Sequence, residues 1–165
     1  MSTTIRLFNS TMETGIRATV VLHAAYPRAF DMTELTWFDH LVVHTGDIGG
    51  PPSLHPDVPQ RTGELLVRRR LIEESIAMMR RLHLIELVTD GMVGFLYRAT
   101  EESSGIVELL RSPYSMALKD RASWLNANIL SRTRAELEEL VAERIGRWDI
   151  GFEYGDKNSK ALNNV

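Results

Sequence analysis

Two short β-forming runs joined at Asp90-Gly91 are the feature that most constrains the fold of this chain. Residues 84–89 read LIELVT and residues 92–99 read MVGFLYRA, and both runs are rich in residues that favour strands. An Asp-Gly pair between two such runs is a strong signal for a hairpin. The sequence therefore predicts one β-hairpin in a chain whose other patterns are helical.

Helical periodicity precedes the hairpin. Apolar residues recur at helical spacing over residues 11–26, and Tyr26-Pro27 is expected to end that helix because proline disfavours helical geometry in the residue before it. Asp31 is predicted to be the N-cap of a second helix that stops at residue 46. The strongest amphipathic pattern predicts a third helix over residues 61–87, which overlaps the first run of the hairpin.

Three further helices are predicted after the hairpin. Ser103 or Ser104 is expected to cap a short helix through residue 110, and Ser112 followed by Pro113 starts a second helix that runs to about residue 128. Residues 133–136 have the form of a capping box and announce the last helix. The predicted fold class is mainly α with a small β-hairpin, ordered as a winged helix-turn-helix-like domain with a C-terminal helical extension.

The chain has 165 residues, which is the length of a single domain with its own core. We expect a winged-helix-like domain over residues 1–100, a helical extension packed on it over 101–150 and a flexible tail over 151–165. The amino-acid composition excludes several classes of function. The chain has no cysteine, which excludes disulfides and thiolate chemistry, and a net charge of -3 is unlike a dedicated nucleic-acid binder.

No apolar run is long enough to span a bilayer, and the first residues, MSTTIRLFNSTMETGIR, lack the apolar core of a signal peptide. We therefore expect a cytoplasmic protein. Residues 46–60, GDIGGPPSLHPDVPQ, hold four prolines and three glycines. No regular element tolerates that density, so the segment is predicted to be a long ordered loop or an exposed connection.

Histidines and aspartates gather between residues 39 and 57 and suggest a metal site. His40 and His44 have the spacing by which two imidazoles on a helix can bind one zinc ion, and Asp47 or Asp57 could complete a hydrolytic site. The favoured interpretation is local packing and turn formation, since Leu41 stands where a zincin motif needs its glutamate. We find no phosphate-binding loop and no serine-nucleophile motif. No catalytic residue, metal or cofactor is therefore predicted.

Charge is unevenly distributed, because six arginines lie between residues 61 and 81 of an otherwise acidic chain. In a winged helix this segment would hold the recognition helix. The six are Arg61, Arg68, Arg69, Arg70, Arg80 and Arg81, of which the first four are the candidate contacts. Three interpretations stay open. The arginines can form a solvated helix face, contact an acidic protein partner, or contact nucleic acid.

Several stretches resemble the middle component of bacterial ABC three-component systems. They are LFNSTMETGIRATVVLHAAYPRAFDM, FDHLVVHTGDIGGPPSLHPDVPQRTGELLVRRRLIEESIAMM and SPYSMALKDRASWL, and the most specific part is the block GPPSLHP followed by GELLVRR. The resemblance covers about residues 7–125. In such systems an SMC/Rad50-like ATPase, a middle subunit and an effector act together, and Lamassu-type phage defence is one of them.

The resemblance implies a non-catalytic accessory subunit that joins the ATPase to the effector, with DNA contacted through the complex. Under this interpretation the prolines stiffen an exposed loop and lower the entropy cost of binding, with Leu54 and His55 as anchors unless they fold back onto the domain. The alternatives are a winged-helix transcriptional regulator, which would use Arg68, Arg69 and Arg70 on DNA, and a metal-dependent hydrolase.

Overall fold

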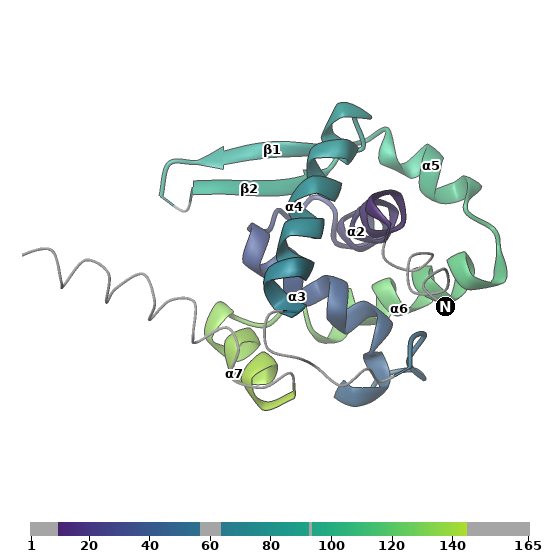
Figure 1. Ribbon diagram of the computed structural model, residues 1–165, viewed down its shortest axis with the longest axis vertical. Helices are drawn as coiled ribbons and strands as arrows, with labels where there is room; N and C mark the ends of the chain where they lie inside the picture. Colours follow the sequence, from purple (N-terminus) through teal and green to yellow (C-terminus); the bar gives the residue numbers. More distant parts are fainter. Residues whose placement is uncertain (1–9, 57–63, 93, 145–165) are drawn as a thin grey trace, which may run out of the picture. The chain divides into compact units, whose positions relative to one another are not determined.

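The computed structural model of the protein describes residues 10–56, 64–92 and 94–144, and the predicted tail over 151–165 lies outside these ranges. The chain forms two compact units, one ending at Ser131 and one beginning at Arg132, and each is described by itself. The first unit contains helices α2 to α6 and a two-stranded hairpin (Figure 1). The mainly α fold with a small β-hairpin is confirmed.

Helices α2 (Thr11–Ala25) and α3 (Met32–Val43) begin at side-chain caps. The Ser10 hydroxyl accepts from the Glu13 N–H, and Asp31 and Glu34 each accept from the other's backbone N–H, which confirms Asp31 as an N-cap. Helix α3 ends at Val43, earlier than predicted, because a 3-10 helix, η1 (Thr45–Ile48), takes over the chain.

Helix α4 (Glu64–Arg81) is shorter at its C-terminal end than the predicted helix over 61–87, and residues 61–63 lie outside the described part. His83 has a φ of 60°, in the left-handed region that ends helices, and the chain enters β1 at Ile85. The periodicity was therefore misleading over residues 82–87. Those residues suit a helix or a strand, and pairing with β2 decides in favour of the strand.

The hairpin pairs β1 (Ile85–Asp90) with β2 (Gly94–Ala99) in antiparallel register, which confirms the prediction made from Asp90-Gly91. Phe30, between α2 and α3, forms an isolated antiparallel bridge with Tyr97 of β2. The order α2, Phe30 bridge, α3, α4, β1, β2 is compatible with the predicted winged-helix-like arrangement.

Helices α5 (Ser103–Leu109) and α6 (Pro113–Asn128) follow the hairpin. Ser112 caps α6 as predicted, since its hydroxyl accepts from the Ser115 N–H at 3.1 Å. The predicted cap of α5 is wrong: its N-cap is Glu102, without a side-chain bond. The hydroxyls of Ser103 and Ser104 donate to carbonyls three residues earlier.

The second unit contains α7 (Arg134–Arg144) among its described residues. Its predicted capping box is confirmed: the Glu136 carboxylate accepts from the Thr133 N–H at 2.8 Å, and the Thr133 hydroxyl accepts from the Glu136 N–H at 3.3 Å.

The core of the first unit is built around α2, which contacts α3, α4, α5 and α6 (Figure 1). Leu22, Phe38, Ile76 and Leu125 come from four of these helices, and each is almost wholly buried. Helices α5 and α6 thus pack on the helices that precede the hairpin. The predicted boundary at residue 100 stays a prediction. In the described ranges, no helix combines the length and apolar character needed to cross a bilayer.

Candidate interaction site

The proline loop, which we define as residues 49–56, folds back onto helices α3 and α6. The N–H groups of Leu54 and His55 donate to the carbonyl of Val43 at 2.9 and 3.1 Å. From α6, the Arg121 guanidinium donates through Nε and Nη2 to the carbonyl of Pro52, at 3.1 and 2.8 Å. The segment is therefore an ordered loop, and Leu54 and His55, predicted as partner anchors, hold it to the domain.

A close approach fixes the loop on α6. A Cβ atom at Gly50 would lie 2.8 Å from the indole ring of Trp124, so only glycine fits there without a shift of the ring. On the other side of the loop, the Thr45 hydroxyl donates to the carbonyl of Pro51 at 2.8 Å. The glycine content of the loop thus has a packing role at Gly50, in addition to turn formation.

A buried ion cluster lies beneath this region. Arg17 of α2 donates through Nε and Nη2 to both carboxylate oxygens of Asp39 on α3, at 2.6 and 3.2 Å. Arg68 of α4 donates to the same carboxylate at 2.9 Å. Arg17 and Asp39 are each 3% exposed, so three helices are tied together by one carboxylate in the core.

Arg17 and Asp39 keep each other ionised. Burial alone would raise the pKa of Asp39, but the Arg17 and Arg68 guanidinium groups outweigh it and hold the pKa of the carboxyl below its usual value. Burial likewise opposes the charge of Arg17, and the contact with Asp39 leaves its pKa raised. Such a cluster stabilises only while it is complete, since a single buried charge without its partner is costly.

A histidine–tyrosine contact joins the proline loop to the start of α6. The Nε2 atom of His55 lies 2.7 Å from the Tyr114 hydroxyl oxygen, and the two rings are stacked with centroids 6.0 Å apart. Burial and the nearby Arg17 guanidinium lower the pKa of His55 to about 4. Burial raises the pKa of Tyr114, against the opposing effect of Arg17. Both side chains are therefore neutral near pH 7.

His40 and His44 lie side by side on α3 and at its end, as their spacing predicts, with ring centroids 4.3 Å apart. Burial, then the neighbouring His44 and Arg68, lower the pKa of His40 to about 3. The imidazole of His44 also meets that of His55 edge-on, at a centroid distance of 6.4 Å. The three histidines thus form a row between α3 and the proline loop.

This row does not gather the carboxylates that a hydrolytic metal site would need. Asp39 is held by two arginines, Asp47 is exposed on η1, and Asp57 lies outside the described residues. Within the described ranges, no group of three or more histidine, aspartate and glutamate side chains is arranged to hold a metal ion. The arrangement that the structure does show holds a loop in place.

The arginines predicted as contacts of α4 have different surroundings. Arg68 turns inward to Asp39, and Arg69 lies 3.4 Å from the Glu73 carboxylate and 3.4 Å from the Thr33 hydroxyl. Arg70 is 82% exposed and lies 3.8 Å from Glu74, an arrangement typical of a solvated face. Arg61 lies outside the described residues. Only Arg70 of the described three is largely available to a partner.

Residues 7–150 match the family model of the ABC-three component (ABC-3C) system Middle Component 2. The chain belongs to this family. The matched range contains the proline loop, the hairpin and all of α7, so the similarity extends beyond residue 125, where the resemblance recognised in the sequence stopped. No curated protein and no solved structure shows significant similarity to this chain.

As a component of an ABC three-component system, this middle component has protein partners, which agrees in part with the partners predicted from the sequence. The residues that sequence reasoning missed are Arg17, Tyr114 and Arg121, which together hold the loop and the core. Arg17 carried a signal: a charged residue inside the apolar run of α2, facing a helix with Asp39 in a similar run. No comparable pattern in the sequence singles out Tyr114 or Arg121.

Proposed function

We propose that the protein is a non-catalytic middle subunit that links an SMC/Rad50-like ABC ATPase to an effector in Lamassu-like anti-phage defence in the bacterial cytoplasm. The observation that carries the proposal is the family match over residues 7–150. The family supplies the place of the chain in a three-component system. The identity of the ATPase and effector, and the role in defence, belong to the proposal.

The internal use of reactive side chains supports a structural role. The Asp39 carboxylate binds two arginines, and the His55 imidazole binds a tyrosine, so groups that could act as bases hold helices and a loop together. A loop that is already ordered before binding lowers the entropy cost of association. This is the behaviour expected of a connector.

The proposal is tested by co-expressing the tagged full chain with the ABC ATPase encoded beside it. We expect the ATPase to be retained on the tag through washes at physiological salt, and cells that lack the chain to lose protection in a plaque assay. Failure of the ATPase to co-purify, with protection unchanged by deletion of the chain, would contradict the proposal.

A second candidate, a DNA-binding regulator, is supported by one observation: the order of α4 followed by the hairpin resembles that of a recognition helix followed by a wing. The isolated protein would then bind duplex DNA with an affinity that falls steeply with salt, because each phosphate contact releases counterions. Arg70→Glu would weaken that binding. The engagement of Arg68 with Asp39 removes one phosphate contact that a regulator would use.

A further inference from the structure

Strand β1 has an open edge in the part of the chain that the structure describes. Its antiparallel partner is β2, and on the other side of β2 Phe30 forms an isolated bridge with Tyr97. The spatial order is thus Phe30, β2, β1. Helix α4 contacts β1, and residues at its C-terminal end line one depression together with residues of the strand.

The register identifies which backbone groups face the open edge. Tyr97 exchanges both backbone hydrogen bonds with Phe30, at 2.9 and 2.8 Å, so its N–H and C=O point away from β1. In an antiparallel ladder the facing residues alternate. Leu87, which is paired with Tyr97, therefore directs its own N–H and C=O away from β2, as does Thr89 two residues on. The Leu84 carbonyl, of opposite parity, accepts from the Thr100 N–H of the neighbouring segment at 3.1 Å.

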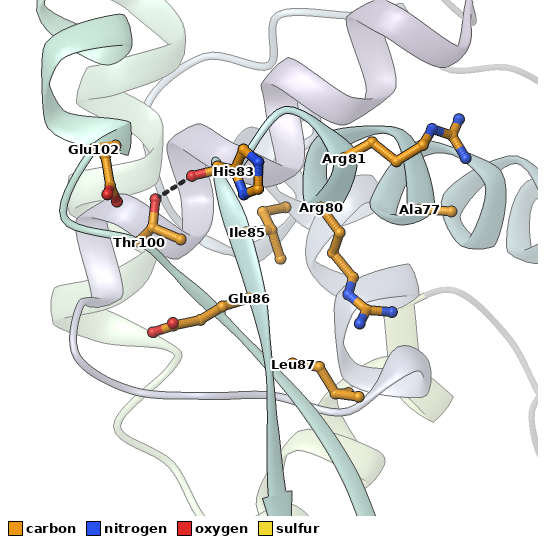
Figure 2. A pocket seen from close by; sticks show the side chains of 9 residues that line it. All are labelled: Ala77, Arg80, Arg81, His83, Ile85, Glu86, Leu87, Thr100 and Glu102. Carbon is orange, nitrogen blue, oxygen red and sulfur yellow. Dashed lines mark hydrogen bonds between the residues drawn. The ribbon is translucent and has the colours of Figure 1, made fainter.

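A depression of about 810 Å³ runs along the start of this edge. Its lining comes from α4 (Ala77, Arg80, Arg81), from β1 (Ile85, Glu86, Leu87) and from the segments next to the hairpin (His83, Thr100, Glu102). Figure 2 shows Arg80 extending on the same side of β1 as Leu87, whereas Glu86 points to the other side.

The charge of the depression is positive on balance. Glu86 is neutralised by Arg98 of β2, with 2.7 Å between the charged atoms. Glu102 contributes one negative charge to the lining, against the two positive charges of Arg80 and Arg81. Both arginines are exposed. An acidic side chain on an added segment would meet these guanidinium groups.

We propose that the open edge of β1 receives an extended, acidic segment of a partner protein, which adds to the hairpin as a further strand. Backbone bonds to Leu87 and Thr89 would provide affinity, and carboxylates facing Arg80 and Arg81 would provide specificity. This is strand addition, a common mode of peptide recognition at free sheet edges. It deepens the proposed function and rests on it, because the partner is the ATPase or the effector of the same system.

The test uses the full chain, free and in complex with the co-expressed ATPase and effector. Amide hydrogen exchange, resolved by residue, is expected to slow at Leu87 and Thr89 in the complex, and to change little at Glu86 and Val88, which already face β2. Double reversal of Arg80 and Arg81 to Glu is expected to weaken binding by about tenfold or more. Arg111→Glu, at an exposed arginine between α5 and α6 that does not line the depression, is the control and should leave binding unchanged.

Leu87→Pro provides a second variant. It removes an N–H that faces away from β2, a change that an edge strand tolerates, and circular dichroism checks that the fold is retained. Strand addition is overturned if this variant and the double reversal both still bind and if amide exchange at Leu87 and Thr89 is unchanged in the complex. The proposed function stays intact in that case. Absence of any complex overturns both. If amide exchange at Leu87 and Thr89 slows in the free chain as the concentration of that chain is raised, the edge binds a second copy of the chain. That result also overturns the proposal.

Discussion

His55 and Tyr114 are joined through a contact of 2.7 Å between Nε2 and the phenol oxygen, although 59 residues separate them in the sequence. One belongs to the proline loop and the other to the first turn of α6. Together with the bonds from Arg121 to Pro52, this contact turns a segment rich in proline and glycine into an ordered part of the domain.

Replacement of Tyr114 by Phe tests that contact. The variant loses the hydroxyl that bonds to His55 and to the Arg17 guanidinium, and should lose about 1–3 kcal/mol of unfolding free energy in urea denaturation. Amide exchange should accelerate at Leu54 and His55, because the loop is released locally. Tyr26→Phe, at a tyrosine that is 45% exposed, is the control and should change neither quantity. Equal behaviour of the two variants would show that the His55–Tyr114 contact does not hold the loop.

Replacement of Asp39 by Asn tests the buried ion cluster. The change leaves the Arg17 guanidinium buried without a countercharge, and we expect a loss of roughly 3–5 kcal/mol in unfolding free energy. Asp120→Asn, on the exposed side of α6, should shift it by less than about 0.5 kcal/mol. If Asp39→Asn lowers the unfolding free energy as little as Asp120→Asn does, the cluster does not stabilise the fold.

Gly50→Ala tests the close approach of the loop to α6. The added Cβ would meet the Trp124 ring at 2.8 Å, and overpacking of this kind costs roughly 1–3 kcal/mol. Gly105→Ala, in α5 with open space at the Cβ position, should be neutral or stabilising because alanine favours helices. Thermal unfolding of both variants is the measurement, and a stabilised Gly50→Ala would contradict the packing.

Stability should fall with acid in a window set by two half-buried histidines, His40 and His55. The pKa values of His40 and His55 are lowered from 6.5 to about 3 and about 4, so the unfolded chain binds their protons first. Their contribution is complete above pH 6.5 and is lost as the pH falls toward 4, with a slope of up to about 1.4 kcal/mol per pH unit for each histidine.

Urea denaturation at pH 7 and pH 5 measures this slope. The double variant His40→Gln, His55→Gln should flatten it, whereas His83→Asn, at an exposed histidine whose left-handed backbone suits asparagine, should not. A slope that the double variant leaves unchanged would assign the acid sensitivity to other groups.

Local signals made much of the fold predictable. The hairpin at Asp90-Gly91 and the caps at Asp31, Ser112 and Thr133 depend on residues within a few positions of one another, so the chain itself carries the information. The end of α4 was not predictable in the same way. Residues 82–87, which follow α4, suit a helix or a strand, and pairing with β2 across the hairpin decides in favour of the strand.

The candidate site was harder to predict because its contacts are long-range. His40 and His44 lie together as their spacing indicates, but nothing in the sequence places Tyr114 on His55 or turns Arg68 inward to Asp39. The arginine pattern of α4 suits a solvent-exposed helix face, a contact with a partner or an ion pair in the core. Only the packing of α2 and α3 against α4 separates these roles.

The role of the protein as a connector is tested most directly by asking whether the effector and the ABC ATPase associate when this chain is left out. Size-exclusion chromatography with light scattering of the co-expressed components provides the measurement. If the protein is a connector, one complex contains all three proteins, and the ATPase and effector elute separately when the middle component is absent. Association of those two without it, or elution of the middle component alone from the full mixture, would contradict its role as a connector.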